Sequence, residues 1–141
     1  MKIALVLLCC ILVFGCADFS SKTEDSVPIT ATLKVTASQI SEGRETPYYN
    51  QKQLQFTAYR MMGETVLKAT TNDKYPNSHG MVDFLFIGTL YKGEHVKLCV
   101  KRGSGFEEVC QTVTYGEAVE NYKEESGRAL VEKEVKVLIG S

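Results

Sequence analysis

The side chains best suited to chemistry are few in this chain and lie far apart along it. Its two histidines, His79 and His95, have no further ligand at the spacing that metal sites use. Adjacent acids stand at 107–108 and 124–125, but neighbours on a strand point to opposite faces and cannot act as a catalytic pair. The sequence therefore predicts a protein that is not an enzyme and that holds no cofactor and no metal, with calcium at one turn as the exception left open.

One segment, residues 72–80, offers oxygen atoms to a cation. Four of its residues have side-chain oxygens of the kind that bind calcium: Asn72, Asp73, Asn77 and Ser78. The same residue types form turns between strands, and the segment has few carboxylates for a tight site. The sequence favours a turn and leaves calcium binding there open.

The first sixteen residues have the pattern of an export signal. Lys2 is followed by an apolar run from Ile3 to Phe14 and then by Gly15 and Cys16, which is the order of a charged, an apolar and a small-residue region. The run is too short for a bilayer core of roughly 30 Å, which needs about 20 residues. The stretch LVFGC at 12–16 resembles the lipobox of bacterial lipoproteins, although Phe14 is bulkier than is usual there.

The lipobox resemblance implies cleavage before Cys16 and attachment of lipid, including palmitate, to that cysteine. Ala17 in the second mature position resembles lipoproteins sent to the outer membrane, if the host has one. The competing interpretation is an ordinary cut after Ala17, which fits the small-x-small rule and would release a secreted protein. We expect the lipid-anchored form and keep the secreted form as the alternative.

Composition and charge define the mature part of the chain. The formal net charge of the whole chain is −1 and becomes one unit more negative without Lys2, so neither nucleic acid nor an anionic bilayer is an expected electrostatic partner. We expect a signal peptide at 1–15, a lipid-anchored flexible tether at 16–28 and one domain at 29–140, because the tether is polar and lacks apolar periodicity.

Two cysteines remain in the body of the chain, Cys99 and Cys110. An even count in an exported chain is typical of a disulfide, and the spacing differs from the Cys-x-x-Cys of catalytic dithiols. Alternating runs at 95–102 and 106–115 flank the turn-forming Gly-Ser-Gly at 103–105, which predicts a hairpin closed by this bond.

The hairpin has one register that satisfies several pairings at once. If Cys99 faces Cys110, apolar residues meet on one face and opposite charges meet at the turn end of the hairpin. The pairs that follow are Val96 with Val113, Val100 with Val109, Lys101 with Glu108 and Arg102 with Glu107. We expect the disulfide to lie on the face opposite the core.

The remaining body also alternates with the period of strands. Further strands are predicted at 29–37, 53–58, 65–71, 81–87 and 129–139. Residues 81–87 are apolar on both faces except at Asp83, which favours a central strand. Residues 116–126 are the one helical candidate, with one or two turns at most. We predict an all-β fold, a single seven-stranded immunoglobulin-like or transthyretin-like sandwich with one hairpin disulfide.

The middle of the chain weakly resembles a known group of sandwiches. The stretches TTND at 70–73, GMVDF at 80–84 and LYKGEHVKL at 90–98 are similar to transthyretin-like modules, which include carboxypeptidase regulatory-like and B-type collagen-adhesin repeats. The chain departs from them in a longer turn at 74–79 and in a final strand without the Asn of an isopeptide bond, so Lys34 is expected to be an ordinary strand residue. The resemblance implies binding or spacing rather than catalysis.

A loop between the first two strands is the candidate partner-binding surface. Residues 42–51 include Arg44, Tyr48 and Tyr49, and Tyr and Arg are enriched at protein interfaces. The alternative is that one tyrosine caps the edge of the core while the other is solvated. The expected function is that of a membrane-anchored, extracytoplasmic binding, adhesion or spacer module. The alternative function is a protein inhibitor or accessory subunit of an envelope complex.

Overall fold

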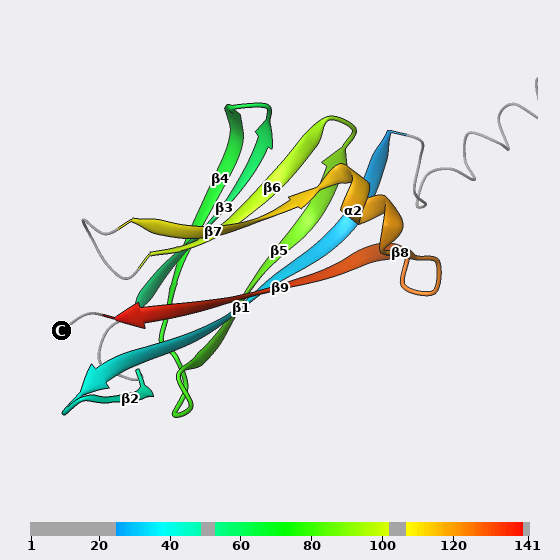
Figure 1. Cartoon of the computed structure of the whole chain (residues 1–141). Helices are drawn as coiled ribbons and strands as arrows, with labels where there is room; N and C mark the ends of the chain where they lie inside the picture. The colour runs from blue at the N-terminus through cyan, green and yellow to red at the C-terminus, as the bar shows by residue number, and fades with distance from the viewer. Residues whose placement is uncertain (1–24, 49–52, 102–106, 140–141) are drawn as a thin grey trace, which may run out of the picture.

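The structure is a computed structural model that describes residues 25–48, 53–101 and 107–139. Within these ranges the chain forms two β-sheets packed face to face, so the all-β sandwich prediction is confirmed (Figure 1). All seven predicted strands are present. Two short strands that the periodicity did not indicate accompany them, and the described residues also include a helical segment at 115–120.

The first sheet is built around β1 (Ser26–Ser41), whose sixteen residues make it the longest strand. Two antiparallel strands share one edge of β1. Strand β5 (Met81–Tyr91) pairs with residues 26–36 of β1, and β2 (Arg44–Pro47) pairs with residues 38–41. On the other edge lies β9 (Arg128–Ile139), parallel to β1, and the two-residue β8 (Tyr122–Lys123) pairs with its beginning. The first and last long strands of the domain are therefore neighbours in the middle of one sheet.

The second sheet has the order β4, β3, β6, β7 and is antiparallel throughout. Its strands are β3 (Leu54–Met62), β4 (Thr65–Lys74), β6 (Glu94–Lys101) and β7 (Glu108–Thr114). The turn between β5 and β6 is one of the places where the chain passes from the first sheet to the second, so these two strands belong to different layers.

The core lies between the inner faces of the sheets and follows the period-2 alternation of the strands. Phe56 of β3 stacks on Phe84 of β5, with ring centroids 5.1 Å apart. The fully buried side chains of β1 are Val27, Ile29, Ala31, Leu33, Val35 and Ala37, and their polar neighbours face outward. Each Å² of apolar surface buried between the sheets stabilises the fold by about 25 cal/mol, so this layer is the main source of stability.

The predicted hairpin register is confirmed over the described residues. Cys99 pairs with Cys110 and forms the disulfide, with a Cα–Cα distance of 4.1 Å. The pairs at 96/113, 100/109 and 101/108 are also present. The expected contact between Arg102 and Glu107 involves a residue outside the described ranges. Cys99 alternates with the core residues Val96, Leu98 and Val100, so the bond does lie on the outer face, yet Cys99 is fully buried there.

Strand β5 corrects one expectation. Its apolar residues on both faces favoured a central strand, but among the described strands it pairs only with β1 and forms a sheet edge. Its outer face remains exposed, with 47% of Leu85 and 66% of Ile87 accessible to solvent. Apolar alternation reports which faces are hydrophobic and carries no information on whether a second neighbour is present.

Three smaller differences concern element boundaries. Strand β1 begins at Ser26, inside the segment expected to be tether. Strand β2 occupies part of the expected loop at 42–51. Residues 72–74, at the start of the segment predicted to be a turn, lie within β4, and the turn follows them. Lys34 is an ordinary strand residue, and its Nζ lies 3.6 Å from a carboxylate oxygen of Glu132.

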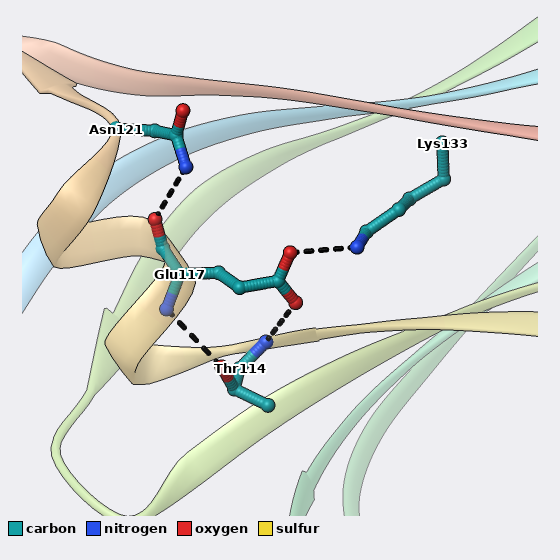
Figure 2. Close-up of polar contacts among 4 residues, drawn as sticks. All are labelled: Thr114, Glu117, Asn121 and Lys133. Atoms are coloured by element: carbon teal, nitrogen blue, oxygen red, sulfur yellow. Dashed lines mark hydrogen bonds and ion pairs between the residues drawn. The ribbon is translucent and has the colours of Figure 1, made fainter.

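The helical candidate forms α2 (Tyr115–Glu120), which closes one end of the sandwich (Figure 1). Thr114 is its N-cap and forms a capping box with Glu117, each side chain accepting the other residue's backbone N–H. The second carboxylate oxygen of Glu117 accepts a hydrogen bond from Lys133 Nζ at 2.6 Å, while Asn121 Nδ2 donates to the Glu117 carbonyl. Figure 2 shows these contacts around Glu117. Lys133 occupies an inward-facing position of β9, and Glu117 neutralises it there.

Candidate functional site

The structure places two of the three residues predicted for the partner-binding loop, Arg44 and Tyr48, in different surroundings. Arg44 is exposed on β2 and pairs with Ser41, the last residue of β1. Tyr48 is only 5% exposed and belongs to the core cluster, and its N–H donates to the carbonyl of Ala37 at 3.0 Å. Tyr49 and Cys16, the predicted lipid-attachment residue, lie outside the described residues. Of the two open interpretations, packing at the core edge therefore describes Tyr48.

The long turn before β5 is organised by Asn77. Its Oδ1 accepts the backbone N–H of His79 at 2.9 Å and that of Met81 at 3.0 Å. A side-chain oxygen that accepts backbone N–H groups two and four residues ahead is a turn-forming group. In this structure the Asn77 oxygen is thus used by the turn itself.

The outer face of the second sheet covers the disulfide with polar side chains. The hydroxyl of Tyr59 donates to both carboxylate oxygens of Glu108, at 3.0 and 2.8 Å. Tyr59 pairs with Lys97, and Glu108 pairs with Lys101. The pair of Cys99 and Cys110 lies between these two rows, so the hydrogen bond from Tyr59 to Glu108 crosses over the disulfide. This arrangement explains why a cysteine on an outer face has no solvent exposure.

Among the described residues, one group of three side chains has metal-ligand atoms close together: Cys99, Cys110 and Glu108. Zinc binds cysteine as the thiolate, and here the two sulfurs are bonded to each other. The structural role of the pair accounts for its position.

The stability of the domain is expected to depend on the ionisation of Tyr59 at alkaline pH. Burial raises the pKa of Tyr59 above 10.0, and the hydrogen bond to Glu108 and its negative charge raise this pKa further. Because the folded state holds the proton more tightly, the stabilisation is complete below pH 10 and is lost as the pH rises through the folded pKa. We expect the free energy of unfolding to fall more steeply between pH 9 and 11 in the parent than in Tyr59→Phe, as measured by urea denaturation. Parallel curves would contradict this.

A groove of about 330 Å³ lies between the edge strands of the two sheets, β4 and β5. One wall is polar and includes Lys68, Thr70 and Asn72 of β4. The other wall is apolar and includes Phe84 and Phe86 of β5. A groove with an apolar wall and a few polar groups is the usual form of a binding site in proteins.

The polar wall is a part of the second sheet's inner face that the first sheet leaves uncovered. Thr70 pairs with Ala58, and Asn72 pairs with Phe56, and directly opposed residues point to the same face of a sheet. Ala58 and Phe56 are buried in the core, whereas every residue from Thr65 to Asp73 is exposed. The second sheet therefore extends past the edge of the first along β4.

The backbone of β5 has unpaired groups next to this groove. The carbonyl of Gly80 accepts the N–H of Ala37 at 2.7 Å, and the N–H of Lys92 donates to the carbonyl of Asp25 at 2.8 Å. Both bonds belong to the register of β5 on β1, so the even-numbered residues of β5 bond to β1. The N–H and C=O groups of the odd-numbered residues point away from β1, since the two directions alternate along an antiparallel strand.

Among the described residues, side chains bond to these outward groups near the two ends of β5. Lys74 Nζ donates to the carbonyl of Asp83 at 2.8 Å, and Glu94 Oε1 accepts the N–H of Tyr91 at 3.0 Å. Within the part of the chain that the structure describes, no strand pairs with β5 on this side between these ends. The outward N–H and C=O groups of Leu85, Ile87 and Thr89 are therefore open along the groove as far as the described residues are concerned.

Sequence reasoning missed this groove, although a signal for it was present. Strand β5 has one charged residue in its eleven, Asp83, and no proline. Natural edge strands are usually protected by charges, prolines or bulges. A long strand without such protection is typical either of the middle of a sheet or of an edge that pairs with something else.

Comparisons of this chain with protein-family models, with curated proteins and with solved structures found no match. The described residues contain no helix that is both long and apolar enough to cross a membrane.

Proposed function

We propose that this protein is a lipoprotein of the bacterial cell envelope, acylated at Cys16, whose sandwich is a non-catalytic binding module. The observation that carries the binding role is the groove of about 330 Å³ between β4 and β5, beside open backbone groups of β5. The disulfide supports the location, because such bonds persist in oxidising compartments outside the cytoplasm. The signal-like start of the chain supports the anchor.

The direction of β1 indicates how an anchored domain would present its surfaces. The chain enters the sandwich at Ser26, beside Tyr91, and sixteen residues of β1 separate this entry from Ser41. At about 3.3 Å per residue this is roughly 50 Å. A lipid on Cys16 would thus hold the β1–β2 hairpin, with the exposed Arg44, at the end of the domain away from the membrane.

The exposed Arg44 also favours the second candidate function, an inhibitor or accessory subunit of an envelope complex. Arginine is enriched where proteins contact one another. An affinity pull-down from envelope extracts separates the two functions. One stoichiometric partner that is lost with Arg44→Ala and kept with Lys136→Ala favours the subunit, and surface adhesion without such a partner favours the adhesion module.

The anchor is tested by the intact mass of the protein extracted from its native host, before and after reduction. We expect a chain that begins at Cys16, carries acyl groups and gains two hydrogens on reduction of the bond between Cys99 and Cys110. A mass that begins at Asp18 without lipid would overturn the anchor and leave a secreted domain.

A further inference from the structure

We propose that the groove beside β5 binds an extended segment of a partner protein, which adds to the first sheet as one more strand. The inference rests on the proposed binding function and names the class of partner. Its starting point is the combination of two features: the open backbone groups at 85–89, and the uncovered inner face of β4 directly beside them. An added strand would form hydrogen bonds with the open backbone groups of β5 and would pack against the uncovered inner face of β4.

The inner wall of the groove sets one half of the partner's chemistry. Side chains of the added strand that point inward would meet Lys68, Thr70 and Asn72. Lys68 is exposed and has no ion-pair partner among the described residues. An acidic side chain at the inward position would neutralise this charge, so the groove favours a carboxylate there.

The outer face sets the other half. Leu85 and Ile87 are about half exposed or more on the outer side of β5, and cross-strand neighbours on one face interact directly. Apolar side chains pointing outward from the added strand would cover them. The partner is therefore an extended segment in which apolar and acidic residues alternate.

The inner face of β5 also has the form of an incomplete layer. An added Cβ at Gly88 would lie 3.0 Å from the ring of Phe86, so this ring lies along its own strand, over the glycine. Phe86 remains partly exposed although it points inward. A neighbouring strand would complete its burial.

The test uses the chain from residue 17 onward, which includes both sheets, the core and the disulfide. The probe is a fluorescein-labelled peptide with the sequence Thr-Val-Glu-Val-Glu-Val-Thr, and the control peptide has lysine in place of glutamate. Fluorescence anisotropy is expected to show saturable binding of the first peptide, weaker by about fivefold or more for the second. Lys68→Glu is expected to reverse this preference.

A proline at position 87 tests strand addition itself. The N–H of Ile87 points into the groove and not toward β1, so Ile87→Pro removes one open donor and leaves the bonds to β1 intact. We expect about a tenfold loss of affinity for the glutamate peptide in Ile87→Pro. Ile87→Ala, which keeps the N–H, should lose much less, and circular dichroism checks that both variants are folded.

Three results would overturn the proposal. They are the absence of saturable binding, equal affinity of Ile87→Pro and Ile87→Ala, and a peptide preference that Lys68→Glu leaves unchanged. Concentration-dependent dimerisation that Ile87→Pro abolishes would also overturn it, because the edge would then belong to a second copy. These outcomes do not depend on lipid, so they are distinguishable from failure of the anchor at Cys16.

Discussion

Replacement of Gly80 with alanine is expected to lower the free energy of unfolding by about 3 kcal/mol or more. Gly80 has a φ of +77°, and an added Cβ would lie 2.2 Å from the carbonyl oxygen of Ala37. This contact is with backbone that cannot move freely. The same carbonyl accepts the N–H of Tyr48 at 3.0 Å, and the N–H of Ala37 donates to Gly80 at 2.7 Å.

Gly63 provides a matched control for the Gly80 substitution. Its φ of +60° is also in the left-handed region, but an added Cβ would have no neighbour within 4 Å. Gly63→Ala should therefore cost only the conformational strain, about 1–2 kcal/mol. Urea denaturation of both variants, with the disulfide intact, measures the difference. Equal losses at the two positions would show that the contact with Ala37 is relieved at no cost.

The sequence predicts best those parts of the fold in which the information is local. The β6–β7 hairpin has a short turn, an alternating pattern and a pair of cysteines, and together these define one register in advance. The pairing of β1 with β9 has no comparable signal. Ile29 lies beside Ala129, one hundred residues away, and the alternating patterns of both strands fit many other registers equally well.

The candidate site shows the same limit from another side. The apolar residues of β5 are visible in the sequence, but the groove exists because β4 extends past β5, and this depends on how two sheets overlap. The position of Tyr48 is set in a similar way. Its backbone N–H bonds to Ala37, and Gly80 approaches both residues from a distant segment of the chain.

Loss of the disulfide is expected to lower the free energy of unfolding by about 3 kcal/mol. The bond closes a loop with a sequence separation of 11, and the chain-entropy relation for a loop of this length gives about this value. Strand β7 pairs only with β6 among the described strands. Its amide hydrogens should therefore show the largest increase in exchange with solvent, while those of β1 change little.

Two forms of the protein separate the cross-link from packing of the sulfur atoms. The reduced parent keeps both sulfurs, whereas Cys99→Ala/Cys110→Ala also removes the buried sulfur at position 99, which is 0% exposed. The difference between parent and reduced parent measures the cross-link, and the further loss in the double variant measures the cavity. If reduction left the unfolding curve unchanged, the hydrogen bonds from Tyr59 to Glu108 would be sufficient to hold β7 in place, because they join β7 to β3 across the same row of the sheet.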